Sequence, residues 1–241
     1  MGHAILRAGG TVVGNNQFAE SGPMLLSWSS GKDSAWTLHV LKRAGADLRG
    51  LITSCNAEHE RVAMHGVRRA LLEAQAEAIG LPIECVDLPF PCTNEEYEAR
   101  MDSAFLRAKE AGIRAVAFGD LYLEDIRAYR VAQMERVGLE PVFPLWELET
   151  AGLAREMMAA GIRAALACVD PKQIDPALAG GDWDEALLAR LPESADPCGE
   201  NGEFHTFVYD SPDFARAIAI ERGEVVEREG FVFADVFPAN A

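Results

Sequence analysis

The stretch from Met24 to Ser34 constrains this chain most, because a short apolar run turns there into a loop of small residues. The apolar run is followed by serines, Gly31 breaks the pattern, and residues 35–41 have helical spacing. The simplest interpretation is a buried strand, a tight turn and a helix that begins near Asp33. The first N–H groups of a helix lack internal partners and lie at its positive end, so this arrangement predicts an anion site.

The loop carries further groups that suit a phosphate. Gly31 lets the backbone approach closely and Lys32 adds a positive charge. A Walker A phosphate loop is excluded, since Leu26 stands at its first glycine position and Asp33 follows the lysine. An ordinary strand–turn–helix with a capping residue remains the alternative at this point. The hydroxyl donors of the loop are Ser29, Ser30 and Ser34.

Composition limits the class of protein. With 241 residues, 49% of them hydrophobic and 25% charged, the chain suits one globular domain plus an appendage. Its net charge of −16 disfavours long nucleic-acid tracks and anionic membranes as partners. Five cysteines without a CxxC pair favour reduced thiols in a cytoplasmic protein, and no apolar run reaches the roughly 20 residues of a membrane span. We expect residues 1–23 to form a loose lead-in.

Strands and helices alternate over residues 24–171. This predicts an α/β fold with a doubly wound, Rossmann-type parallel sheet and helices on both faces. After residue 172 strands follow one another, which predicts a smaller C-terminal α+β subdomain over residues 172–241. Expected helices cover about 35–44, 64–79, 93–111, 123–137, 151–160 and 186–190, and expected strands 24–28, 47–54, 82–88, 115–118, 141–144, 164–169, 204–209, 216–221 and 225–236.

Three polar clusters follow expected strands, at residues 29–34, 56–65 and 119–124. Parallel sheets of this kind bind ligands at the carboxyl ends of their strands, so the clusters should converge on a single site.

Asp33 and Asp120 are candidate Mg²⁺ ligands, because hard cations take carboxylate oxygens. Gly119 would admit a close nucleotide beside Asp120. Two alternatives stay open: Asp33 can be a helix N-cap, and the charged run that includes Glu124 can be a solvated helix start.

A second unusual stretch runs from Asp196 to Thr206 and gathers titratable groups beside glycines. We interpret it as a substrate-recognition and acid/base loop, with Glu203 or His205 as the general base. A zinc site is disfavoured because one Cys and one His do not complete a tetrahedral set. Cys198 as a nucleophile has weak support from His205 alone.

Together these motifs resemble those of the diphthine–ammonia ligase family, within the ATP pyrophosphatases of the PP-loop, adenine nucleotide alpha hydrolase superfamily. The resemblance spans most of the chain and implies an ATP-dependent amide-forming ligase. Such an enzyme adenylates a carboxylate, produces AMP and pyrophosphate, and uses ammonia as the amine donor. In the family the acid is diphthine, a modified histidine on elongation factor 2. The motifs that carry the resemblance are SSGKDS at 29–34, Met64-His65-Gly66, FGDLYLEDIRAYR at 118–130 and CGENGEFHTF at 198–207.

The resemblance also implies roles for individual residues. The nucleotide-binding set is Ser29, Ser30, Gly31, Lys32, Asp33, Ser34, Met64, His65 and Gly119. The catalytic set is Lys32, Asp120, Glu124, Glu200, Glu203 and His205, with Asp33 and Asp120 holding Mg²⁺. The acceptor-binding set is Asn201, Gly202 and Thr206.

Two other functions stay open. One is a PP-loop ATP pyrophosphatase that acts on a different small-molecule or RNA acceptor, although the negative charge disfavours a tRNA-modifying enzyme. The other is an ATP- or AMP-binding protein without turnover, which would keep residues 29–34 but have no use for residues 200–205. The expected partners are ATP, AMP and ammonia, with an elongation factor carrying diphthine and a second copy of the chain as further candidates.

Overall fold

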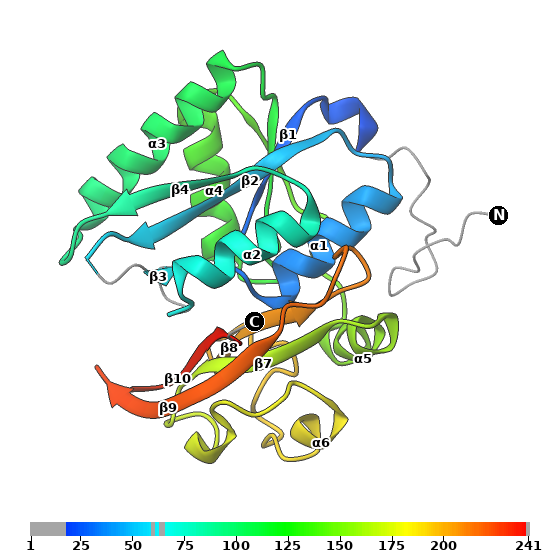
Figure 1. Cartoon of the computed structure of the whole chain (residues 1–241). Coiled ribbons are helices and arrows are strands. Elements are labelled where there is room, and N and C mark those ends of the chain that lie inside the picture. Colours follow the sequence, from blue (N-terminus) through cyan, green and yellow to red (C-terminus); the bar gives the residue numbers. More distant parts are fainter. Residues whose placement is uncertain (1–17, 59–60, 63–65, 240–241) are drawn as a thin grey trace.

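A parallel β-sheet forms the centre of the N-terminal part of the computed structural model, which describes residues 18–58, 61–62 and 66–239 (Figure 1). β1 (Met24–Ser27) pairs in parallel with β2 (Leu48–Asn56) on one side and with β5 (Ala115–Ala117) on the other. β4 (Ile83–Leu88) extends the sheet beyond β2, and β6 (Glu140–Val142) extends it beyond β5. A two-residue strand, β3 (Arg61–Val62), lies antiparallel to the end of β2.

Helices cover both faces of this sheet. α1 (Lys32–Arg43) and α2 (Arg69–Ile79) pack on one face, while α3 (Asn94–Glu110) and α4 (Glu124–Val137) pack on the other (Figure 1). The chain winds outward from β1 to β4 and then returns past β1 to β5, so right-handed crossovers place the two helix pairs on opposite faces. The predicted doubly wound α/β fold is confirmed.

The side chains of β1 contribute to two hydrophobic cores, one on each face of the sheet. Met24 and Leu26 are buried in the core shared with α1 and α2, whereas Leu25 lies in the core shared with α3 and α4. Successive side chains of a strand point to opposite faces, so a strand covered on both sides must be apolar throughout. This requirement explains the unbroken apolar run in the sequence.

Local signals explain where several helices begin and end. The Thr93 hydroxyl accepts a hydrogen bond from the backbone N–H of Glu96, and the Glu96 side chain accepts one from the N–H of Thr93. This capping box starts α3. α2 and α4 end at Gly80 and Gly138, both in the left-handed conformation that glycine adopts easily. The sequence predicts these boundaries correctly.

The start of α2 differs from the prediction. The expected helix began near residue 64, but residues 66–68 are not helical and α2 begins at Arg69. The N–H of Val62 donates to the carbonyl of Val67 at 2.7 Å, so the chain folds back on β3 before it enters the helix. The helical spacing of apolar residues over 67–79 does not reveal that the chain first folds back on β3.

The C-terminal part forms a second, antiparallel sheet in the order β8-β7-β10-β9 (Figure 1). Its strands are β7 (Arg163–Val169), β8 (Phe204–Asp210), β9 (Ile220–Arg228) and β10 (Phe231–Pro238). α5 (Thr150–Ala160) leads into β7, and the short α6 (Glu185–Leu188) lies between β7 and β8. The remaining elements are two short 3-10 helices, Ala19–Ser21 and Pro176–Leu178.

Two predictions about this sheet are wrong. Residues 164–169 were expected in the parallel sheet, but β7 pairs with β8 and β10 instead. The expected strands at 216–221 and 225–236 are replaced by β9 and β10, which are joined at Glu229 and Gly230, both with positive φ. Pairing partners distant in sequence decide both points. The division of the chain at residue 172 stays a prediction.

Polar contacts join the two sheets. The N–H of Val208 in β8 donates to the carbonyl of Ser30, in the loop between β1 and α1, at 2.9 Å. Arg68 and Arg61 both bind the Asp235 carboxylate of β10, with Nε of Arg68 and Nη2 of Arg61 each 3.0 Å from Oδ1. These guanidinium groups hold the pKa of Asp235 below its usual value. The second sheet is therefore held directly against the loop that follows β1.

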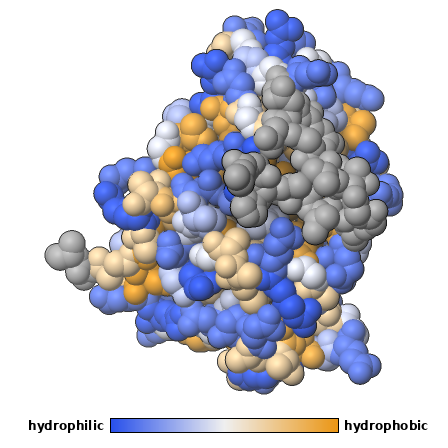
Figure 2. Space-filling view, turned by 90° about the vertical axis from the view of Figure 1, so that its right-hand side faces the viewer, coloured by the Kyte–Doolittle hydropathy of each residue, from blue (hydrophilic) through white to orange (hydrophobic). Residues whose placement is uncertain are grey.

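The face shown in Figure 2 is mostly hydrophilic, with apolar side chains scattered in small groups. In the part of the chain that the structure describes, no helix is long and apolar enough to cross a membrane. The five cysteines are free thiols.

Candidate functional site

A cavity opens beyond the carboxyl ends of β1 and β5, where the winding of the sheet reverses. Open α/β sheets bind ligands at this position. The structure brings together the predicted clusters at 29–34 and 119–124, and it adds the stretch that precedes and begins β8. The lining residues are Ser27, Ser29, Lys32, Asp33, Ser34, Phe118, Gly119, Asp120, Leu123, Ile126, Arg130, Cys198, Gly199, Glu200, Phe204, His205 and Thr206. The described residues of the third cluster, 56–58 and 61–62, do not line it.

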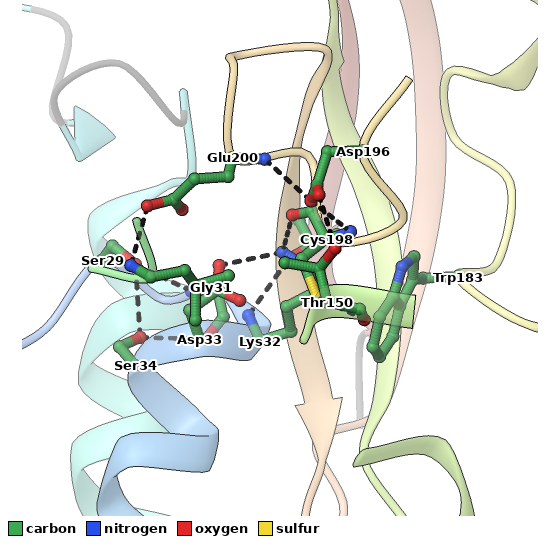
Figure 3. A network of polar contacts seen from close by, with 12 residues as sticks. Ser29, Gly31, Lys32, Asp33, Ser34, Thr150, Trp183, Asp196, Cys198 and Glu200 are labelled. Atoms are coloured by element: carbon green, nitrogen blue, oxygen red, sulfur yellow. Dashed lines mark hydrogen bonds and ion pairs between the residues drawn. The ribbon is translucent and has the colours of Figure 1, made fainter. Parts of the chain in front are cut away.

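The N-terminus of α1 forms one wall of the cavity. Its N-cap residue, Gly31, has no side chain to offer, and Thr206 of β8 takes that place by accepting a hydrogen bond from the N–H of Lys32 at 3.1 Å. The hydroxyls of Ser29 and Ser34 lie 3.2 Å apart, and Ser34 donates to the Gly31 carbonyl at 2.9 Å (Figure 3). Two hydroxyls thus lie beside the positive end of a helix, which is an arrangement that binds anions.

Ser30 shapes the loop rather than the cavity. Its φ of 70° is left-handed, a conformation that costs a non-glycine residue some energy. Its carbonyl accepts hydrogen bonds from the N–H of Val208 at 2.9 Å and from Nε2 of Gln75 at 3.1 Å. Gln75 is fully buried and also binds the Val208 carbonyl and the Trp28 indole. The Ser30 side chain is buried behind the loop, outside the cavity lining.

The Lys32 side chain is buried and extends toward the C-terminal segment (Figure 3). Its Nζ donates to Oδ2 of Asp33 at 2.8 Å and to the Cys198 carbonyl, and it lies 5.4 Å and 5.7 Å from the ring centroids of Phe204 and Trp183. Burial alone would lower the pKa of Lys32, but the Asp33 carboxylate outweighs burial and the pKa is raised. The amine therefore stays charged and joins the loop after β1 to the loop before β8.

Two carboxylates reach the cavity, Asp33 from the first turn of α1 and Asp120 from the loop after β5. Oδ1 of Asp33 and Oδ2 of Asp120 are buried, and neither has a hydrogen-bond partner within the described residues. Burial raises the pKa of both side chains, opposed by Lys32 at Asp33 and by Arg130 at Asp120. Oxygens of this kind are the ligands that Mg²⁺ takes in proteins, usually one or two carboxylates together with substrate phosphates. Among the described residues, no three His, Cys, Asp or Glu side chains could hold a metal without such help.

Gly119 lines the cavity, and close packing requires a glycine at this position. A Cβ atom at this position would lie 3.0 Å from Oγ1 of Thr37 and 3.1 Å from the carbonyl oxygen of Asp33. Only glycine lets the loop after β5 approach the first turn of α1 this closely. The close approach brings Asp120 next to Asp33.

Asp196 orders the loop that precedes β8. Its Oδ1 accepts hydrogen bonds from the N–H groups of Cys198 at 2.7 Å and Glu200 at 3.4 Å, and its Oδ2 accepts one from the Thr150 hydroxyl at 2.7 Å. This pattern is a carboxylate that caps its own turn.

Glu203 acts within the same loop and points away from the cavity. It is 1% exposed, and its carboxylate accepts hydrogen bonds from the N–H of Asp196 at 2.7 Å, from the N–H of Asn201 at 2.9 Å and from the Asn201 amide at 3.1 Å. A carboxylate with three donors is a structural acceptor. Glu203, Asn201 and Gly202 do not line the cavity.

Glu200 and His205 do line the cavity. Oε1 of Glu200 accepts hydrogen bonds from the N–H groups of Leu121 at 2.8 Å and Tyr122 at 3.4 Å, so Glu200 also holds the loop after β5. Burial is the main cause that raises the pKa of Glu200, to about 7. Burial and the nearby Lys32 lower the pKa of His205 to about 4, which leaves its imidazole neutral at pH 7. Glu200 is therefore poised to exchange a proton near neutral pH.

Cys198 is a buried structural thiol. Its Sγ donates to the Thr150 carbonyl at 3.4 Å, and burial raises the pKa of the thiol. Because the thiolate is the nucleophilic form, this environment makes the side chain inert at neutral pH.

The remaining predicted residues lie elsewhere. Glu124 is the first residue of α4 and is exposed outside the cavity lining. Met64 and His65 lie outside the described residues. Sequence reasoning included Gln75 and Arg130 in motifs that carry the resemblance but gave them no role at the site; Gln75 orders the loop, and Arg130 lines the cavity. The spacing of Leu123, Ile126 and Arg130 at i, i+3 and i+7 was an available signal, since it places the three on one helix face.

Comparisons with known proteins agree on one family. Residues 24–141 match the family described as the diphthamide synthase N-terminal domain. The chain is 27% identical to a diphthine–ammonia ligase of Bos taurus over 86% of each chain, and 26% identical to one of Homo sapiens over the same shares. It is 27% identical to a diphthine–ammonia ligase of Danio rerio over 86% of this chain and 90% of that one. A solved structure described as a predicted subunit of a tRNA methyltransferase from Methanocaldococcus jannaschii aligns with 59% of this chain and 80% of that one. Its TM-score of 0.40 and identity of 16% are too low to bear on function.

Proposed function

We propose that the chain is a ligase of the diphthine–ammonia ligase type, as its similarity to that family supports, and that it adenylates a carboxylate with ATP and transfers the acyl group to ammonia. The family makes it an ATP-dependent ligase of the diphthamide pathway. One observation carries the more detailed proposal. A helix N-terminus, two buried carboxylate oxygens without hydrogen-bond partners among the described residues, and a carboxyl group with a pKa of about 7 all lie at a single cavity at the switch point of the sheet.

The wall formed by α1 suits the pyrophosphate that leaves. The negative charge that develops on this group grows as the bond between the α- and β-phosphates breaks. The N-terminus of α1 and the hydroxyls of Ser29 and Ser34 are already in place to stabilise that charge. Thr206 fixes the start of the helix from outside, so the donors need not reorganise during the reaction.

Asp33 and Asp120 fit a Mg²⁺ ion. Their buried oxygens lack hydrogen-bond partners within the described chain, and a cation beside them would relieve the cost of burying two carboxylates together. Bound there with ATP, Mg²⁺ would neutralise phosphate charge.

Glu200 is the best placed general base. Ammonia reaches the site largely as ammonium, which must lose a proton before its nitrogen can attack the acyl carbon. Glu200 lines the cavity with a pKa of about 7, whereas Glu203 is committed to three hydrogen bonds and the pKa of His205 is about 4. We therefore assign the proton transfer to Glu200 rather than to the two residues that the sequence favours.

The test is AMP production. The purified protein is incubated with α-labelled ATP, Mg²⁺ and ammonium, with and without an elongation factor 2 that carries diphthine. AMP that appears only with the factor supports the proposal and identifies the acceptor.

The other outcomes discriminate between the rival functions. AMP formed without the factor points to a PP-loop pyrophosphatase with a different acceptor. Binding of ATP without any AMP overturns the ligase proposal in favour of a nucleotide-binding protein. Elongation factor from a strain that does not make diphthine is the matched control.

A further inference from the structure

Two cations line the cavity, and they differ in what they can still bind. The Lys32 side chain is 3% exposed and already donates to Asp33 and to the Cys198 carbonyl. The Arg130 side chain is 24% exposed and lines the same cavity from α4. The Lys32 side chain cannot move toward a ligand without breaking these two contacts, which join the two loops. Arg130 is therefore the accessible cation.

The face of α4 aims Arg130 at the cavity. Leu123, Ile126 and Arg130 all line it, and their spacing places them on one side of the helix. Ile126 remains 36% exposed there, an apolar side chain at the edge of a polar cavity. This wall therefore offers two aliphatic groups and one guanidinium to whatever occupies the cavity.

Aromatic rings hold the guanidinium in place. Its Cζ lies 5.1 Å from the ring centroid of Phe118 and 5.8 Å from that of Tyr129. Its Nε is buried and has no hydrogen-bond partner within the described residues. The nearest carboxylate oxygen, Oδ2 of Asp120, is 3.9 Å from this Nε, which is too long for a hydrogen bond. The group is oriented and partly desolvated, and its Nε–H has donor capacity left over.

We infer that Arg130 binds the α-phosphate of the nucleotide, the phosphate that stays on AMP. The inference rests on the proposed function in two respects: it takes the cavity as the ATP site and the N-terminus of α1 as the pyrophosphate site. The N-terminus of α1 takes the leaving pyrophosphate, so the α-phosphate must lie beside it in the same cavity. A guanidinium presents paired donors that match phosphate oxygens, and a site shielded by aromatic rings strengthens the contact.

The experiment compares AMP with adenosine, which differ by this phosphate alone. Binding of each is measured by titration calorimetry to the wild type and to the variants Arg130→Gln and Arg130→Lys. Arg136→Gln is the matched control, because Arg136 lies on the same helix and pairs with Asp102 outside the cavity. Arg130→Gln should weaken AMP binding by at least about tenfold and leave adenosine binding unchanged, as expected for loss of a charge-assisted hydrogen bond.

Each other outcome decides against the inference. Equal losses for AMP and adenosine would mean that Arg130 only packs against Phe118. Unchanged AMP binding in the variant, or no AMP binding by the wild type, would also overturn it. If Arg130→Gln unfolds at a lower temperature, Arg130→Lys decides: it keeps the charge and should retain part of the preference for AMP over adenosine.

The proposed function can fail separately. A wild type that binds AMP through Arg130 but never forms AMP from ATP would remove the ligase reaction and leave this inference standing.

Discussion

The loop after β1 and the loop before β8 are both polar, yet they use their polar groups in opposite ways. The first, residues 29–34, turns two hydroxyls and a helix N-terminus toward the cavity, and outside groups fix its backbone. In the second, residues 196–203, Oδ1 of Asp196 and both carboxylate oxygens of Glu203 accept hydrogen bonds from N–H groups of the loop itself. Thr206 and Gln75 bind backbone groups of the first loop from outside it. In the second loop Asp196 and Glu203 bind backbone groups from within the loop itself.

This difference separates structural acids from functional ones. A loop rich in Asp and Glu suggests catalysis, but a carboxylate that satisfies several N–H groups is already committed. In the second loop only Glu200 reaches the cavity with a pKa shifted toward neutrality. Lys32 connects the two loops, because its Nζ donates hydrogen bonds to the Asp33 carboxylate in the first and to the Cys198 carbonyl in the second.

Replacing Lys32 should have the largest effect on both AMP formation and stability. Lys32→Ala leaves the Asp33 carboxylate buried without its cation and releases the Cys198 carbonyl. We expect AMP formation to fall below detection and the free energy of unfolding to drop by about 3 kcal/mol, as for loss of one partner of a buried pair. Urea unfolding monitored by circular dichroism measures the second effect. Lys32→Met, which keeps the packing on Phe204 and Trp183, separates charge from volume. If both variants were as stable as the wild type, Lys32 would not hold the two loops together.

Glu200→Gln tests the functional acid of the second loop. The amide oxygen can still accept from the N–H of Leu121, so the fold should persist within a few degrees of the wild-type melting temperature. Turnover with ammonium should fall by about 100-fold or more, the usual worth of a general base. Rates of AMP formation measure this. A variant that turns over like the wild type would remove Glu200 from the reaction.

Glu203→Gln is the structural counterpart and should show the reverse pattern. Its amide nitrogen would face an N–H of the loop in place of an acceptor oxygen, which should cost about 1–3 kcal/mol of unfolding free energy. Turnover of the folded fraction should change less than in Glu200→Gln. Melting temperatures and AMP assays on the same preparations give both numbers. A large loss of turnover without a loss of stability would restore Glu203 as the base.

The pH dependence sharpens the assignment further. Glu200 has a raised pKa of about 7, so its carboxylate form, which accepts a proton, grows as pH rises through that value. Turnover should therefore increase from about pH 6 to about pH 8. Hydroxylamine replaces ammonium in this assay, and the concentration of its neutral form is kept the same at every pH, so that titration of the amine itself does not contribute. The Glu200→Gln variant should show no such rise; a rise equal to the wild type would assign the titration to another group.

The smallest effect is expected at Cys198. The buried thiol makes one long hydrogen bond to the Thr150 carbonyl, and its raised pKa keeps it protonated. Cys198→Ser should keep AMP formation within about threefold of the wild type, and iodoacetamide should not inactivate the folded enzyme at pH 7. Rapid, stoichiometric inactivation that the variant escapes would show a nucleophilic role.

Much of the fold could be predicted because its signals are local. Strand–helix alternation, the capping box at Thr93 and the glycines that end α2 and α4 depend on neighbours in sequence. The membership of β7 in the second sheet could not be predicted, because its partners β8 and β10 lie far along the chain. The start of α2 was predicted wrongly because the chain folds back on β3, where Val62 donates to the Val67 carbonyl, before the helix begins. The spacing of apolar residues gives no sign of this contact.

The sequence by itself indicated that residues 29–34, 119–124 and 196–206 contribute to the site and which residue types they bring. It also predicted a contribution from residues 56–65, whose described part does not line the cavity. Only the tertiary structure decided what each side chain does there. It turned Glu203 into a loop acceptor, buried Lys32 between two loops and left Arg130 open to the cavity. The physical reason is that a side chain's chemistry depends on burial and on which donors and acceptors remain unpaired. At Lys32 two of these partners lie far along the chain: Thr206 accepts from its N–H, and the Cys198 carbonyl accepts from its Nζ.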